Sequence, residues 1–405
     1  MTVRESLAER LKSARESTGL TQQQVADWLG VRRPAIAEIE SGARAVKSDE
    51  LVRLAALYGR SLAWLVAGEL RPEDSIAAAL FRADTPADPV LRGEAASLVR
   101  RCAVVFELER KLGAPVAARA PDYSDPTALE DRSRAMVHGR RVARAERARL
   151  GIGDGAPLRD PWGVVEDAGV RVLPLGLGSE HRIDGIFTRG ADGRACVGVN
   201  VGKWVFRQVF TVVHEYGHAL MDADLTGEAC ATSAGWSGAA SRYANRELRA
   251  NQFAAVFLVP REALLRFLES RDRLRGGARP RAVGLTAVEL IRAQDHFGAS
   301  VDMILWRLRN EGLIDAAERK RLREEVDRQG NVVLARSLGY DVGRFAQPFH
   351  RAHEIVLRAY AAGEISLGVA ADVFGLPREQ MRARLREWGI EQELRGDDVL
   401  VGGGE

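Results

Sequence analysis

Residues 207–220 read RQVFTVVHEYGHAL, and residues 247–260 read ELRANQFAAVFLVP. In the first stretch His214 and His218 stand four residues apart, so both project from the same face of a helix. Two imidazoles in this arrangement can hold one zinc ion. Glu215 lies beside that face, where a carboxylate can take a proton from an attacking water. The pattern therefore indicates a metal centre of the kind that hydrolases use.

The HExxH pattern is expected on a helix over Trp204–Met221, because Phe210, Val213 and Leu220 give that segment an apolar side. With 7 histidines in the chain, an HExxH arises by chance with odds of about one in a hundred. The alternative is a core helix with two structural histidines. The metal-binding interpretation is favoured.

A catalytic zinc site has three protein ligands and one open position, so a third ligand must come from elsewhere in the chain. Glu247 is the favoured third ligand, on a helix expected over Asn245–Leu258. Asn251 shares a face with Glu247 and can orient the site through a hydrogen bond. The expected ion is Zn²⁺, with Mn²⁺ as the alternative. Other candidate ligands are His181, Asp222, Asp224 and Glu228.

Short β-branched segments precede the HExxH helix and predict a small sheet, over residues 170–173, 185–188 and 195–200. Most of the remaining chain has helical patterning, which predicts a mainly α fold with a small sheet, of the α+β class. One helix, over Ala128–Leu150, is rich in arginine, and a solvated helix face is favoured there over a nucleic-acid stripe.

The N-terminal segment carries a second pattern. Residues 20–42 read LTQQQVADWLGVRRPAIAEIESG, in which a small residue, a glycine and an apolar residue follow the four-then-six spacing of a helix-turn-helix, at Ala26, Gly30 and Ile36. Its second helix is expected from about Arg32 to Glu40. The candidate DNA-binding residues are Gln22, Arg32, Arg33, Ala35, Arg44 and Lys47. The alternative is a helix-turn-helix used for protein contact.

These motifs resemble two known families. Residues 20–42 resemble the XRE (phage-repressor and Cro-like) family, over about sixty residues, which implies a five-helix DNA-binding domain for double-stranded DNA. The paired stretches at 207–220 and 247–260 resemble the ImmA/IrrE family of metallo-endopeptidases, over roughly Thr127–Leu313. The matching residues are Arg207, Phe210, Thr211, His214, Glu215, His218, Glu247, Ala250, Asn251, Phe253, Ala254 and Pro260.

The second resemblance implies a minimal thermolysin-like zincin core, with His214, His218 and Glu247 as metal ligands and Glu215 as catalytic base. It also implies cleavage of a helix-turn-helix repressor. Arg249 and Val256 stand where many relatives have acidic residues. A further oxyanion donor is not identified, and Tyr216, Tyr243 and His181 are the candidates.

The C-terminal part of the chain repeats the first spacing. In SLGVAADVFGLPREQMRARL, residues 366–385, Ala371, Gly375 and Met381 follow the same four-then-six pattern, which predicts a second helix-turn-helix-like unit. Packing alone is the favoured role for it, and DNA contact is the alternative. An HxxH pair at His350 and His353 is favoured as a surface or core pair over a metal site.

Four segments follow from these patterns. We expect a helix-turn-helix domain over residues 1–70, a helical connector and linker over 71–126, a metallopeptidase domain over 127–313 and a helical domain over 314–405.

The composition sets limits on the functional class. The 405 residues carry a formal net charge of +3, which excludes a strongly basic coat and leaves nucleic-acid binding to local surfaces. The chain contains no long apolar run and its N-terminus lacks a secretory pattern, so we expect a cytoplasmic protein without membrane spans. The three cysteines are far apart in the sequence, and we expect neither a disulfide framework nor a thiolate metal site.

The sequence is compatible with two functions. The favoured one is a zinc endopeptidase linked to transcription that cleaves a helix-turn-helix repressor, or itself, in a stress or phage response. The alternative is a DNA-binding regulator whose metallopeptidase-like domain senses a ligand or metal with little or no proteolysis. A homodimer is plausible because helix-turn-helix proteins commonly read two half-sites, although the sequence shows no clear dimer seam.

Overall fold

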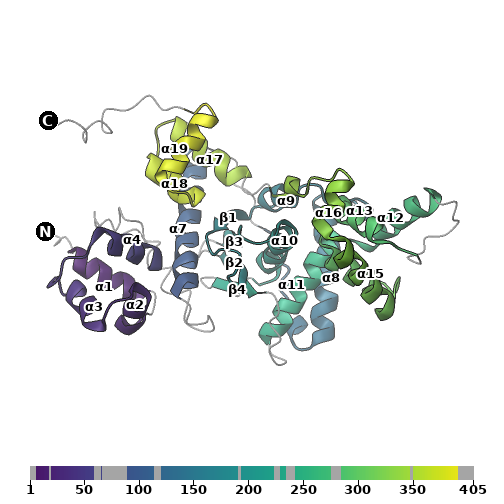
Figure 1. Cartoon of the computed structure of the whole chain (residues 1–405), viewed down its shortest axis with the longest axis horizontal. Helices are drawn as coiled ribbons and strands as arrows, with labels where there is room; N and C mark the ends of the chain where they lie inside the picture. The colour runs from purple at the N-terminus through teal and green to yellow at the C-terminus, as the bar shows by residue number, and fades with distance from the viewer. Residues whose placement is uncertain are drawn as a thin grey trace.

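The computed structural model describes residues 6–17, 20–58, 65, 89–113, 120–189, 193–222, 229–233, 242–274, 284–346 and 350–390. Within these ranges the chain is mainly helical, with one small mixed sheet at its centre (Figure 1). The fold is therefore of the mainly α type with a small sheet that the sequence predicts. No helix in the described ranges combines the length and the apolar character needed to cross a membrane.

The N-terminal helices are α1 (Leu7–Ser17), α2 (Gln22–Leu29), α3 (Arg33–Glu40) and α4 (Ser48–Leu57). Thr21 caps α2 through a capping box with Gln24, and Gly30 ends the helix in the left-handed region at φ 75°. Ala26 and Ile36 are buried where the two helices cross. The helix-turn-helix spacing thus forms as predicted, while the fifth helix of this unit falls outside the described residues.

The sheet has the strand order β1-β3-β2-β4, with β1 (Arg171–Leu175) parallel to β3 (Ala195–Asn200). Strand β2 (Ile183–Arg189) runs antiparallel to both β3 and β4 (Ala229–Ser233). The first three strands correspond to the predicted segments. Strand β4 is not predicted from the sequence. It pairs with β2 and forms one edge of the sheet.

The predicted HExxH helix is α10 (Val205–Met221), and the helix carrying Glu247 is α11 (Arg242–Leu258). Helix α10 lies between the sheet and α11, so it is buried along almost its whole length. On the sheet, Val197 and Val199 face this side and join the large core around α10. The arginine-rich helix α8 (Arg132–Arg149) packs along α11.

Helix α8 is a packed element rather than a nucleic-acid stripe. Arg147 is fully buried, and its guanidinium donates to the carbonyl oxygens of Phe257, Gly153 and Ala156. Arg149 pairs with Glu146 on the same helix. Arg141 and Arg144 are exposed, so part of α8 is the solvated face that the sequence favours, whereas Arg147 has a buried structural role that the sequence does not predict.

The opposite face of the sheet is covered by α7 (Pro89–Lys111) and by the C-terminal helices. These are α17 (His350–Ala361), α18 (Leu367–Phe374) and α19 (Arg378–Glu387). Leu98 of α7 packs with Leu173 and Leu175 of β1 and with Phe374 of α18 in one cluster. Segments that are almost three hundred residues apart therefore share one hydrophobic core with the sheet.

The remaining elements lie on the far side of α8 and α11 or beside α10 (Figure 1). They are η1 (Pro126–Leu129), α9 (Pro161–Asp167), α12 (Arg261–Leu274), α13 (Ala287–Phe297), α14 (Val301–Asn310), α15 (Ala316–Gln329), α16 (Asn331–Ser337) and η3 (Val342–Phe345). Ser300 caps α14, as its position before that helix predicts.

The expectation for the cysteines is wrong in one respect. Cys102 of α7 and Cys196 of β3 form a disulfide, with a Cα–Cα distance of 6.5 Å. Their separation of 94 residues hides this pairing in the sequence, because it depends on α7 lying across the sheet. The bond joins the connector helix to the face of the sheet opposite α10.

Candidate functional site

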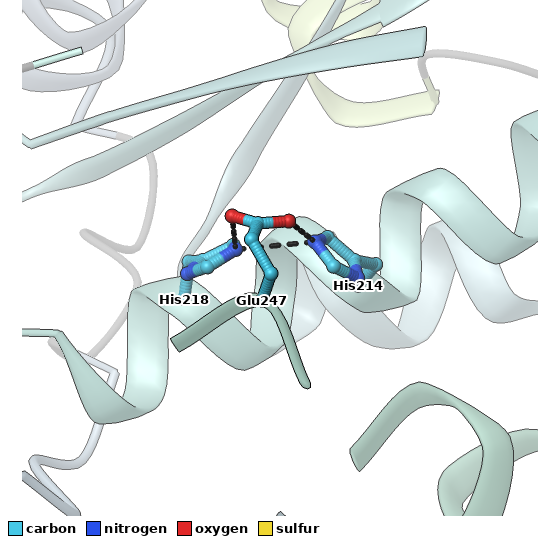
Figure 2. A group of neighbouring side chains, drawn as sticks. All are labelled: His214, His218 and Glu247. Atoms are coloured by element: carbon cyan, nitrogen blue, oxygen red, sulfur yellow. Dashed lines mark hydrogen bonds and ion pairs between the residues drawn. The ribbon is translucent and has the colours of Figure 1, made fainter. Parts of the chain in front are cut away.

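Three side chains from two helices meet at the centre of the molecule. His214 and His218 lie one turn apart on α10, and Glu247 of α11 places its carboxylate between the two imidazoles (Figure 2). Glu247 Oε2 lies 3.4 Å from His214 Nε2, and Glu247 Oε1 lies 3.3 Å from His218 Nε2. The two Nε2 atoms are 3.1 Å apart. One atom from each residue therefore faces a common point.

The chemistry of these three groups fits a divalent cation. Their candidate ligand atoms all lie within 4.8 Å of one another, and no other such group occurs among the described residues. Both imidazoles are fully buried, whereas the Glu247 side chain is 14% exposed. Two imidazole nitrogens and one carboxylate form a ligand set that zinc hydrolases use.

The outer nitrogens of both imidazoles are also held. His214 Nδ1 lies 3.1 Å from Asn251 Oδ1, and His218 Nδ1 lies 2.8 Å from Asp222 Oδ2. Because an oxygen can only accept, each Nδ1 carries the hydrogen and each Nε2 is left to present a lone pair to a metal. The contact that the sequence predicts for Asn251 is therefore present.

Asp222 is one of the candidate third ligands, but its carboxylate does not face the common point of the cluster. It lies on the far side of His218, against Nδ1. Asp222 is four residues after His218, which is the spacing that could have indicated this contact. Arg249 of α11 is buried and donates to the same carboxylate, while Arg246 Nε lies 3.4 Å from it.

These contacts shift the pKa values of the cluster. Burial alone lowers the pKa of His218, but hydrogen bonds to Asp222 and Glu247 outweigh it and raise the pKa to about 10. Burial raises the pKa of Glu247, and the two imidazoles outweigh it and hold that pKa below its usual range. Burial also raises the pKa of Asp222, but the contacts with His218 and Arg249 outweigh this effect and lower the pKa. These shifts favour a protonated His218 beside two carboxylates in the metal-free cluster, and a cation bound at Nε2 would replace the proton there.

Glu215 follows His214 directly in the sequence and lies on the side of α10 that faces β2. The side chain is fully buried. A methyl group added at Gly185 of β2 would lie 2.9 Å from Glu215 Oε1 and would also collide with Thr211. Glycine at position 185 therefore leaves the space that the carboxylate of Glu215 occupies.

The structure places the other candidate residues away from this centre or outside the described ranges. Tyr216, one of the three candidate oxyanion donors, turns toward α8 and donates to Glu146. His181 accepts a hydrogen bond from the backbone of Ile183 and does not join the cluster. Asp224, Glu228 and the side chain of Tyr243 lie outside the described residues.

The candidate DNA-binding residues lie around α3. Arg32 and Arg33 are exposed at its start, Ala35 is half-buried, and Lys47 is exposed. Gln22 donates to Glu40, and Arg44 donates to Glu50, so these two side chains also link the helices and loops of the unit.

The HxxH pair lies in the C-terminal helices. His353 stacks on Phe374 at a centroid distance of 3.8 Å, and the side chain of His350 is not described.

Comparison with known families assigns two parts of the chain. Residues 6–80 match the family described as a helix-turn-helix domain, and residues 165–309 match the family described as an IrrE N-terminal-like domain. The second match contains both metal-binding stretches. The chain therefore carries a helix-turn-helix domain followed by an IrrE-like metallopeptidase domain, as the two sequence resemblances imply.

One curated relative matches the N-terminal part. It is an uncharacterized HTH-type transcriptional regulator, YqaE, of Bacillus subtilis (strain 168), 39% identical over 62 residues. The match covers 15% of this chain, and the chain spans about half the length of that relative, 53%. No solved structure is significantly similar to the chain.

Proposed function

We propose that this chain is a DNA-binding zinc endopeptidase that cleaves a helix-turn-helix repressor or itself. The observation that carries the proposal is the convergence of His214 Nε2, His218 Nε2 and the Glu247 carboxylate, with both Nδ1 atoms held from outside. Supporting it, an IrrE-like metallopeptidase domain and a helix-turn-helix domain occur in the same chain.

His214, His218 and Glu247 would hold the ion, with Asn251 and Asp222 fixing the two imidazole rings. Zn²⁺ suits two imidazoles and one carboxylate, and Mn²⁺ is the alternative ion. When bound, zinc polarises the scissile carbonyl and makes the attacking water more acidic. The 14% exposed edge of Glu247 marks the side from which solvent reaches the three ligands.

Glu215 is the proposed general base. It follows His214 directly on α10 and is buried against β2, which is the position that a base has in the HExxH pattern. In this role it takes the proton from the attacking water and then passes it to the leaving amide nitrogen. The same residue thus serves both halves of peptide-bond cleavage.

The proposed substrate is a helix-turn-helix repressor, or the chain itself, in a stress or phage response. The fused helix-turn-helix domain supports this choice, because α3 can hold the enzyme on the DNA to which such a repressor binds. Arg32 and Arg33 are the residues proposed to contact that DNA, with Ala35, Lys47, Gln22 and Arg44 around them.

A second function is supported by a contact between the helix-turn-helix unit and the connector helix. Helix α4 of the helix-turn-helix unit touches α7, and α7 packs on the sheet beneath the metal ligands. A change at the metal site could pass along this route to the DNA-binding unit. The chain would then be a regulator that senses a ligand or metal with little or no proteolysis.

A cleavage assay with Glu215→Gln separates these functions. Zinc-loaded protein is incubated with candidate helix-turn-helix repressors, and intact-mass spectrometry maps any cut. We expect cleavage by the unaltered chain and by a control, Glu324→Gln, whose site is exposed on α15. Glu215→Gln should bind zinc and DNA but leave the substrates and itself intact. A regulatory response that survives Glu215→Gln without any cut supports the sensing function instead.

A further inference from the structure

The turn between α18 and α19 repeats the turn between α2 and α3. Gly375 ends α18 in the left-handed region at φ 64°, and its N–H reaches the carbonyls of Ala371 and Asp372. Gly30 ends α2 in the same region at φ 75°, with its N–H on Ala26 and Asp27. Each glycine stands nine residues after the hydroxyl residue that caps its helix. Two separate segments therefore build the same helix-turn-helix connection.

The packing of the two units also agrees. Ala371 is buried at the crossing of α18 and α19, as Ala26 is between α2 and α3. Met381 is fully buried six residues after the turn glycine, in the place that Ile36 occupies in the first unit. The second helix of each pair therefore turns the same side toward its own core and presents the other side to solvent.

The exposed side of α19 is basic. The helix carries four arginines and two glutamates, a balance of 4 − 2 = +2, and its exposed side chains include Arg382, Arg384 and Arg386. With the residues that the structure describes, none of these three forms an ion pair. Helix α15 provides the contrast, because Arg321 and Arg323 there bond to carboxylates of Glu318, Glu325 and Asp327.

The spacing of these charges points to an anionic partner. Arg378, Arg382 and Arg386 stand four residues apart, so like charges follow one another along one face of α19. Like charges at this spacing destabilise a helix, and a row of phosphates would relieve the repulsion. Arg378 also lies close over α18, where a methyl group at Gly368 would be 2.6 Å from its Nη2.

Both units are attached to one helix. Helices α17 and α18 pack on α7, and α4 of the first unit touches α7 as well. Figure 1 shows the N-terminal unit beside α7 and helices α17 to α19 at the upper end of α7. We propose that α18 and α19 form a second DNA-binding unit, with Arg382, Arg384 and Arg386 on the phosphates and groove of double-stranded DNA. This surface is separate from both sites of the proposed function.

The salt dependence of DNA binding tests this assignment. The full chain is titrated onto a fluorescein-labelled 40-base-pair duplex of mixed sequence at several salt concentrations. Each phosphate contact contributes about 0.9 to the slope of log K against log salt. This slope is negative. We expect the triple variant Arg382→Ala, Arg384→Ala and Arg386→Ala to reduce its magnitude by about 2 to 3. Alanine favours helix, so α19 should persist.

A matched variant controls for net charge. Arg309→Ala, Lys320→Ala and Arg328→Ala remove three exposed cations from α14 and α15, and α15 lies across the molecule from α19 (Figure 1). We expect its slope to equal that of the unaltered chain. Circular dichroism checks folding, and the single variants Arg382→Ala and Arg386→Ala, each expected to reduce the magnitude of the slope by about 0.9, replace the triple variant if it does not fold.

Each outcome has a distinct meaning. A slope whose magnitude falls in the α19 variant but not in the control supports the second unit. An unchanged slope in the α19 variant overturns it, and a loss of binding only in Arg32→Ala with Arg33→Ala then leaves the first unit as the DNA-binding site. A changed association state by sedimentation, with an unchanged slope, makes α19 a protein-contact helix. Absence of any binding by the unaltered chain contradicts both DNA-binding proposals.

Discussion

Arg249 and Asp222 form a buried ion pair directly behind the proposed metal ligands. The carboxylate of Asp222 accepts from the Arg249 guanidinium and from His218 Nδ1, so the arginine is linked to an imidazole through one shared acid. Arg249 also donates to the carbonyl oxygen of Met221 at 3.1 Å. Arg249 therefore anchors the acid that holds the His218 ring.

Arg249→Met is therefore expected to weaken zinc binding. The change leaves the buried Asp222 carboxylate without its main counter-charge and loosens its hold on His218. Partners of this kind typically contribute 10- to 100-fold to metal affinity, so we expect a loss of about that size. Competition with a chromophoric chelator measures it. An affinity equal to that of the control Arg319→Met would show that the ion pair does not support the site.

Gly185→Ala is expected to abolish cleavage while zinc stays bound. The added methyl would lie 2.9 Å from Glu215 Oε1, so the proposed base must move, whereas the three ligands are not in its way. Gly153→Ala is the control, since nothing lies within 4 Å of a methyl group there. Cleavage rate and zinc content are measured together. Unaltered cleavage by Gly185→Ala would remove Glu215 from its position in the mechanism.

The disulfide predicts the number of free thiols. The chain has 3 cysteines, and a Cys102–Cys196 bond leaves 3 − 2 = 1 thiol, that of Cys230. Thiol titration in denaturant should therefore find one thiol per chain before reduction and three after it. Closing a loop of this size stabilises a fold by up to about 4.7 kcal/mol in the chain-entropy account, so reduction should also lower Tm. Three thiols in the unreduced protein would contradict the bond.

His138 predicts how stability changes with pH. Burial, and then the charges of Arg249 and Arg141, lower its pKa to about 4 from 6.5. Between these values the unfolded chain binds more protons, so the free energy of unfolding falls as the pH drops from about 6.5 to 4. In His138→Gln the slope should decrease by up to about 1.4 kcal/mol per pH unit. Denaturant unfolding of the metal-free protein measures it, and an identical slope in the variant would contradict this account.

The local parts of the site follow from sequence spacing. His214 and His218 share a face because a helix advances four residues in about one turn, and Glu247 could be named because a second motif accompanies the first. The turn glycines Gly30 and Gly375 are equally local, since each follows its capping residue at a constant distance. Such features depend on one or two elements alone.

The parts that the sequence does not reveal depend on contacts between distant segments. Strand β4 exists because β2 offers it an edge, and the Cys102–Cys196 bond exists because α7 crosses the sheet. Tyr216 is a candidate oxyanion donor by sequence position alone, and the packing of α8 brings Glu146 to its hydroxyl. In the same way, Asp222 and Arg249 meet only once α10 and α11 are packed together.

Zinc content per chain tests the central claim, that His214, His218 and Glu247 together hold the ion. The unaltered chain, Glu247→Gln and the control Glu262→Gln, which is exposed on α12, are dialysed against the same zinc buffer. Inductively coupled plasma mass spectrometry then gives the metal-to-protein ratio. We expect about one zinc ion in the unaltered chain and in the control, and a large loss in Glu247→Gln. Full zinc occupancy in Glu247→Gln would contradict the proposed ligand set.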